Sequence, residues 1–272
     1  MFDFLRYWHR RRAAAHIGAA EWRATVANLP LLDGLSTAEL EQLRELACRF
    51  LDEKNLEPAG GLELAPEMGP LIAAQACLPI LHLGLDYYRG WYSLILYPEG
   101  FLAHHEYTDA DGLVHKVHRP LIGEAWENGP VILSWADILD TLDEPGLNVV
   151  IHEMAHKLDM LNGAVNGMPP LHRDMRVDRW SRSFNRAYRH LCRQVDSGQA
   201  TALDPYAAES PAEFLAVASE LFFTMPGTLA TTYPAVYRQL AAFYRQDPLA
   251  RFMACGRLPA APVPAGPEPE YD

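Results

Sequence analysis

The sequence His-Glu-Met-Ala-His at positions 152–156 constrains this 272-residue chain more than any other feature. Residues four apart on an α-helix project from the same face, so the imidazoles of His152 and His156 can bind one metal ion. Glu153 lies about 100° further round such a helix, where it can take a proton from a metal-bound water. The run VVIHEMAHKLDML contains no Gly or Pro, which favours the helix. The alternative is an amphipathic core helix with two buried histidines and a surface glutamate.

A zinc peptidase site also needs a third protein ligand and one open position for water. The longer metzincin motif needs a glycine at position 159 and a histidine at position 162. The chain has Asp159 and Asn162 there, so the sequence excludes that class. The third ligand is then expected to be a carboxylate from a later helix. The segment YAAESPAEFLAVASELFF offers three, which are Glu209, Glu213 and Glu220.

The spacing of these glutamates does not choose between them. Ser210-Pro211-Ala212-Glu213 matches a helix capping box, so Glu213 can instead reach back to the Ser210 N–H. Glu220 lies seven residues further on and shares nearly the same helix face, as a ligand or as a hydrogen-bond partner of one. Asp159 is either a partner of a ligand imidazole or a solvent-facing residue near the end of its helix.

Beyond the motif, the chain resembles the Mlc titration factor A family of bacterial zinc metallopeptidases over most of residues 29–250. The resemblance lies in several blocks that occur in the same order. The helices around the motif are also similar to the C-terminal domain of anthrax lethal factor, in which a tyrosine precedes the glutamate ligand by seven residues. Tyr206 and Glu213 have that spacing. The blocks are LDYYRGWYSLILYP, GEAWENGPVILSW, VVIHEMAHKLDMLNG, DPYAAESPAEFLAVASELFF and FYRQDP.

This resemblance implies that His152, His156 and Glu213 bind one Zn2+ per chain. It also implies that Glu153 is the general base and acid, and that the Tyr206 hydroxyl stabilises the oxyanion. The implied activity is aminopeptidase-like hydrolysis of peptide substrates, in a zincin-like (gluzincin) domain. The implied partner is an Mlc-type transcriptional repressor that links the protein to sugar phosphotransferase regulation. The alternative function is a non-catalytic or latent regulator that sequesters such a repressor.

Hydrophobic periodicity predicts an α+β fold, with a small sheet packed on a helical second half that carries the motif. Strands are expected within 91–98, 101–107 and 131–135, and a loop over 54–69. Three regions are expected along the chain. They are an N-terminal helical segment (1–28), a zinc metallopeptidase domain (29–258) and a disordered, Pro-rich acidic tail (259–272).

Charge and cysteine content narrow the class of partner. The chain has 35 acidic and 23 basic residues, for a net charge of −12, which disfavours general nucleic-acid binding. Four isolated cysteines without a CxxC pair, and no recognisable export signal, favour a cytoplasmic protein. The most apolar stretch, 71–85, is shorter than the ~20 residues that span a bilayer, so no stable membrane insertion is expected.

Overall fold

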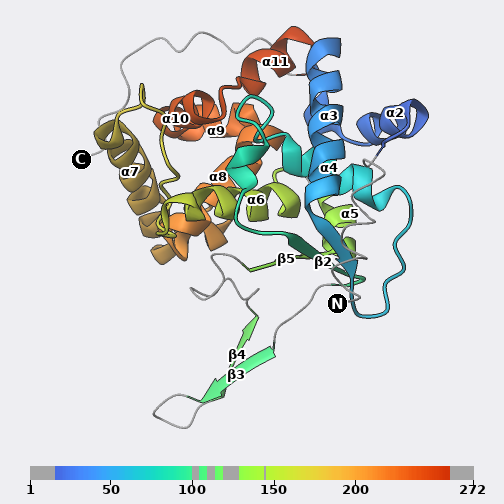
Figure 1. Ribbon diagram of the computed structural model, residues 1–272. Coiled ribbons are helices and arrows are strands. Elements are labelled where there is room, and N and C mark those ends of the chain that lie inside the picture. Colours follow the sequence, from blue (N-terminus) through green and yellow to red (C-terminus); the bar gives the residue numbers. More distant parts are fainter. Residues whose placement is uncertain (1–15, 100–103, 109–113, 119–128, 144, 258–272) are drawn as a thin grey trace.

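The computed structural model describes residues 16–99, 104–108, 114–118, 129–143 and 145–257 (Figure 1). Three predictions therefore lie outside the described residues, at least in part: the beginning of the 1–28 segment, the 259–272 tail and the first residues of the strand expected within 101–107. The helices are α2 (Ala19–Ala27), α3 (Thr37–Glu53), α4 (Met68–Cys77), α5 (Trp135–Asp143), α6 (Val149–Asp159), α7 (Val177–Asp196), α8 (Pro211–Thr224), α9 (Pro226–Thr232), α10 (Pro234–Tyr244) and α11 (Pro248–Ala254). Short 3-10 helices are η1 (Pro30–Leu32), η2 (Leu85–Tyr88), η3 (Met160–Asn162) and η4 (Pro205–Ala208).

A three-stranded parallel sheet lies beside this helical body (Figure 1). Its strands are β1 (Asn55–Pro58), β2 (Ser93–Tyr97) and β5 (Val131–Ser134), in the order β1-β2-β5. Leu94 and Leu96 of β2 are buried, and the residues between them are partly exposed, which is the alternation that one covered sheet face produces. Two further strands, β3 (His104–Thr108) and β4 (Val114–His118), form an antiparallel pair. The predicted α+β class is confirmed.

The loop predicted over 54–69 is wrong at both of its ends. Residues Asn55–Pro58 form β1, and α4 begins at Met68. The exposure of the four residues of β1 does not alternate along the strand, and the strand is held in place by its pairing with β2. The Asn55 N–H donates to the Tyr92 carbonyl at 2.7 Å, and the Ala59 N–H to the Leu96 carbonyl at 2.9 Å.

Helices α6 and α8 pack against each other in the middle of the molecule (Figure 1). From Ala212 to Phe223 every residue of α8 is buried, as expected for a mostly apolar helix at the centre of a domain. The N-cap of α6 is Asn148, whose side-chain oxygen accepts the Ile151 N–H at 2.9 Å. Within the described ranges, no helix has the length and apolar character needed to cross a membrane.

Candidate metal centre

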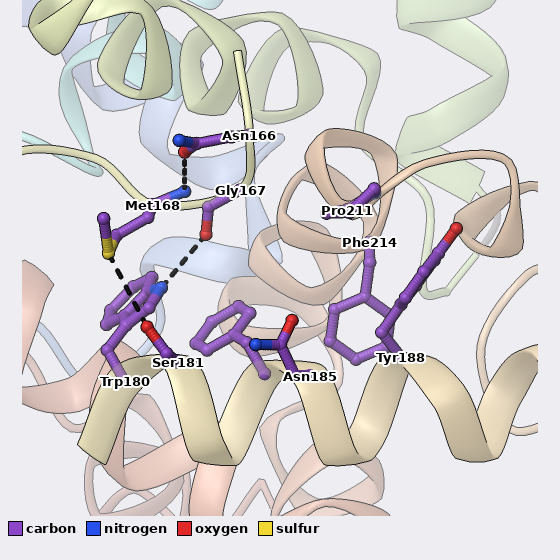
Figure 2. A pocket seen from close by; sticks show the side chains of 10 residues that line it. Asn166, Gly167, Met168, Trp180, Ser181, Asn185, Tyr188, Pro211 and Phe214 are labelled. Carbon is purple, nitrogen blue, oxygen red and sulfur yellow. Dashed lines mark hydrogen bonds between the residues drawn. The ribbon is translucent and has the colours of Figure 1, made fainter. Parts of the chain in front are cut away.

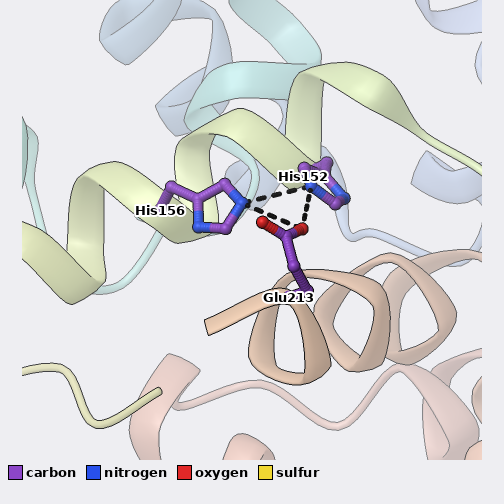
Figure 3. A group of neighbouring side chains, drawn as sticks. All are labelled: His152, His156 and Glu213. Carbon is purple, nitrogen blue, oxygen red and sulfur yellow. Dashed lines mark hydrogen bonds and ion pairs between the residues drawn. The ribbon is translucent and has the colours of Figure 1, made fainter. Parts of the chain in front are cut away.

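Two histidines of α6 and one glutamate of α8 meet between these helices (Figure 3). The Nε2 atoms of His152 and His156 are 3.1 Å apart. The Glu213 Oε2 atom lies 3.1 Å from His152 Nε2 and 3.4 Å from His156 Nε2. The motif therefore lies on a helix, as predicted, and its two imidazoles point to one carboxylate from a distant part of the chain.

These three atoms are spaced as ligands of one zinc ion would be. Tetrahedral coordination with bonds of about 2.0–2.1 Å places neighbouring ligand atoms ~3.3 Å apart, and the observed separations lie close to this value. Two nitrogens and one carboxylate oxygen also form a donor set that zinc peptidases use, with a fourth position left for water. The residues therefore fit a catalytic rather than a closed structural site.

The other carboxylate of α8 lies behind His152. Glu220 Oε1 accepts a hydrogen bond from His152 Nδ1 at 2.7 Å, and its Oε2 accepts the Asn148 N–H at 2.5 Å. A hydrogen bond from Nδ1 leaves Nε2 as the nitrogen that is free to bind a metal. The structure thus separates two glutamates that their spacing could not: Glu213 faces both Nε2 atoms, and Glu220 orients one imidazole.

Sequence reasoning missed two residues that support this arrangement. Asn148 begins α6, and its side-chain amide donates to Gln75 Oε1 at 2.7 Å. Both side chains are buried. A polar Gln75 inside the apolar run LIAAQACLPILHLGL was the available signal, because a buried amide needs hydrogen-bond partners. Asn148 carried a second signal, since asparagine before an apolar helical run favours an N-cap.

Asp159 matches neither expectation. It is fully buried, so it does not face solvent, and its Oδ2 accepts the Gly167 N–H at 2.7 Å rather than a histidine N–H. Burial raises the pKa of Asp159 above its ordinary value, although the N–H groups of Gly167 and Met168 act to lower it. Asp159 thus holds the connection after α6 close to the metal helix.

That connection forms one wall of a small pocket of about 160 Å³ (Figure 2). The Gly167 carbonyl accepts the indole N–H of Trp180 at 3.0 Å. Gly167 has φ +77°, and a Cβ placed there would lie 2.4 Å from the Pro211 carbonyl oxygen. Only glycine allows this close approach between the connection and the start of α8. The connection after α6 is thus anchored at Gly167.

The remaining predicted site residues surround the cluster. Tyr206 lies on η4, its side chain partly exposed, with its ring centroid 6.2 Å from that of His152. Glu153 is half-buried on α6. Glu209 is exposed and does not belong to the His/Glu cluster.

The histidines and glutamates of the cluster shift one another's pKa values. Burial acts to lower the pKa of His152, but Glu213 and Glu220 raise it well above its ordinary value. Burial acts to raise the pKa of Glu213, but hydrogen bonds with His152 and His156 lower it to about 2. Glu213 is therefore ionised at neutral pH, which is the state that binds a cation.

Comparisons with known proteins agree with this geometry. The family model described as "Glucose-regulated metallo-peptidase M90" matches residues 5–245. The chain is 40% identical over 232 residues to Mlc titration factor A of Klebsiella pneumoniae, which covers 85% of this chain and 87% of that protein. It is 41% identical over 236 residues to Mlc titration factor A of Yersinia enterocolitica, with the same shares covered. The Yersinia pestis protein of that name is 39% identical over 248 residues, 90% of each chain.

Proposed function

The chain belongs to the glucose-regulated metallo-peptidase M90 family, and on this premise we propose that it is a zinc-dependent peptidase of the zincin-like (gluzincin) type. His152, His156 and Glu213 hold one zinc ion per chain. The observation that carries the proposal is the convergence of two Nε2 atoms and one carboxylate oxygen at separations of 3.1–3.4 Å. Residues 29–258 form the catalytic domain, and the protein works in the cytoplasm.

A zinc ion held by His152, His156 and Glu213 would supply Lewis-acid chemistry, lowering the pKa of a water and polarising a substrate carbonyl. Glu153 accepts a proton from the attacking water and returns it to the leaving amine, since it lies on the same helix as both histidines. The Tyr206 hydroxyl donates to the oxyanion of the tetrahedral intermediate. Glu220 keeps the His152 imidazole in one orientation and one tautomer.

The substrate is a peptide, and it binds by forming backbone hydrogen bonds with strand β5. β5 lies at the edge of the described three-stranded sheet, where its outer side can accept an extended peptide by β-augmentation. Lys157 directly follows the ligand His156 and donates from Nζ to the Gly129 carbonyl at 2.9 Å, which fixes the entry to β5 beside the metal helix. We assign an aminopeptidase-like specificity, on the family resemblance alone.

A second function follows from the names of the relatives, which describe titration of Mlc. We propose that this chain also binds an Mlc-type transcriptional repressor. A latent regulator that only sequesters a repressor remains the competing function. The two differ in one respect that can be measured, because sequestration does not need a general base.

The decisive experiment compares wild type, Glu153→Gln and Glu45→Gln on a panel of amino-acyl anilides, with the zinc content of each sample measured. Glu45 lies exposed on α3 and provides the same change of charge away from the site. We expect Glu153→Gln to retain zinc and to be ~10²-fold or more slower, because a general base contributes on that scale. Glu45→Gln should match wild type.

Two results would contradict the peptidase proposal. If all three samples hold zinc and none cleaves any anilide or peptide, the metal is structural and the regulator takes precedence. If Glu153→Gln cleaves as fast as wild type, Glu153 is not the base. Repressor binding is measured on the same samples and should be equal in all three.

A further inference from the structure

A second cavity, of about 520 Å³, lies apart from the metal cluster, and no cluster residue lines it. It is formed by the segment after η2, the connection between α6 and α7, and the end of α10. We call it the arginine pocket. Its charged and polar lining residues are Tyr87, Arg89, His172, Arg173, Asp174 and Arg245.

The three arginines reach this pocket from three distant segments, and none is neutralised there. In the described ranges, no carboxylate lies within ion-pair distance of Arg89, Arg173 or Arg245. The nearby Arg176, in contrast, pairs with Asp178 at 2.9 Å. Asp174 is the only acidic residue in the lining, so the pocket has a net charge of +2 from these groups, in a chain of net charge −12.

The wall of the pocket is fixed by its own hydrogen bonds. His172 Nε2 lies 2.8 Å from the Phe243 carbonyl oxygen, and its Nδ1 lies 3.3 Å from the Tyr87 hydroxyl. The His172 ring also stacks on Phe243, with centroids 5.6 Å apart. Both nitrogens of His172 are thus engaged in the scaffold, which leaves the arginines as the groups available to a ligand.

Arg245 occupies a backbone position that normally favours glycine. It is the C-cap of α10 and has φ +54°, the left-handed conformation in which helices commonly place a glycine. Among the described residues it is the one non-glycine with positive φ. A strained residue of this kind is a pointer to function when its side chain lines a cavity.

We propose that the arginine pocket binds a phosphate monoester of a small polar molecule. Guanidinium groups match the oxygens of phosphate with paired N–H donors. A phosphate monoester carries about −1.5 to −2 charges at pH 7, which matches the +2 of the pocket, whereas a carboxylate carries only one. The pocket is much larger than a phosphate group, and Asp174 can accept a hydrogen bond from a hydroxyl on the rest of the ligand.

The proposed site adjoins the metal helix without depending on it. Leu161, in the turn that continues α6, lines the pocket, and Arg173 belongs to the connection that Gly167 anchors to Asp159. A bound phosphate monoester therefore contacts the same segment that Asp159 holds against α6. Binding itself requires only the three arginines, so it stands whether or not the chain is a peptidase.

The test is isothermal titration of the full-length, zinc-loaded protein with glycerol 3-phosphate, and with glycerol and acetate as controls. We expect saturable binding of glycerol 3-phosphate and none of glycerol, with acetate at least about tenfold weaker. Arg89→Gln and Arg173→Gln should each weaken binding about tenfold or more, since each removes a charge-assisted hydrogen bond. Arg245→Gly should do the same while keeping a backbone that favours φ > 0.

Arg179→Gln is the matched control, because Arg179 is exposed on α7 and does not line the pocket. It should change the affinity less than about twofold. The proposal is overturned if no binding is detected up to about 10 mM glycerol 3-phosphate, or if acetate binds equally well. It is also overturned if binding is insensitive to the arginine variants and disappears when zinc is removed, since the anion then sits at the metal.

Discussion

Two helices of this protein begin with the same four-residue pattern and use it differently. The N-cap of α3 is Ser36, with Glu39 three residues later. The N-cap of α8 is Ser210, with Glu213 three residues later. In both, the serine hydroxyl accepts the N–H of the glutamate, at 3.2 Å in α3 and 3.1 Å in α8. The first half of the capping box is therefore the same in both places.

The second half of the capping box, which is the contact made by the glutamate carboxylate, differs between the two helices. The Glu39 carboxylate returns to its own helix and accepts the Ser36 N–H at 2.9 Å. The Glu213 carboxylate turns away from its helix and meets His152 and His156. The start of α3 is solvent-exposed, whereas that of α8 faces the imidazoles of a neighbouring helix. The local pattern fixes where each helix begins, and the tertiary surroundings decide what its glutamate does.

The largest expected effect comes from replacing Glu213 and Glu39 by glutamine in turn, which tests whether only one of them contributes to zinc binding. Glu213→Gln should lower zinc affinity more than ~10²-fold, because losing a ligand costs more than losing a hydrogen-bond partner of a ligand. Glu39→Gln should bind zinc as wild type does. Metal content after dialysis against a buffered zinc series measures both variants. Equal zinc binding by the two would mean that Glu213 is not a zinc ligand.

A further variant, Glu220→Gln, tests whether the two carboxylates of α8 contribute differently to zinc affinity. Glu220 bonds His152 Nδ1 and the Asn148 N–H, so it orients a ligand without facing the Nε2 atoms. We expect zinc affinity to fall by 10–100-fold, the range for residues that support a ligand, and therefore less than in Glu213→Gln. The same zinc series measures it. A larger loss than in Glu213→Gln would reverse the roles of the two glutamates.

The sequence was sufficient for features that depend on local spacing. The HExxH helix and the capping box at the start of α8 each depend on a pattern within one turn or a few turns, so their own residues reveal them. The candidate ligands could also be reduced to three glutamates by this means. The choice between Glu213 and Glu220 could not, because both lie on nearly the same face of one helix and only the position of α6 separates them.

The sequence was insufficient where order comes from a distant partner. Strand β1 has only four residues and forms because β2 offers a parallel edge. Gln75 interrupts an apolar helix for a reason that lies 73 residues away, at the Asn148 amide. The arginine pocket is the extreme case, since Arg89, Arg173 and Arg245 are unremarkable singly and become a site only when the chain brings them together.

The smallest expected effect is on the free energy of unfolding, which Glu39 at the start of α3 makes dependent on pH. Burial acts to raise the pKa of Glu39, but hydrogen bonds from Ser36 and the charge of His82 leave it below its ordinary value of 4.5. A lowered folded-state pKa means that the ionised carboxylate stabilises the fold above about pH 4.5. That contribution is lost as the pH falls through the folded-state pKa. Because Glu39 is partly exposed, we expect only a few tenths of a kcal/mol.

The measurement is the free energy of unfolding of wild type and Glu39→Gln by urea titration at several pH values on either side of 4.5. Wild type should be the more stable at the higher values, and the difference should shrink towards zero at the lower ones, because a protonated glutamate no longer differs from glutamine in charge. A difference that is constant with pH would mean that the capping box at α3 acts through geometry alone.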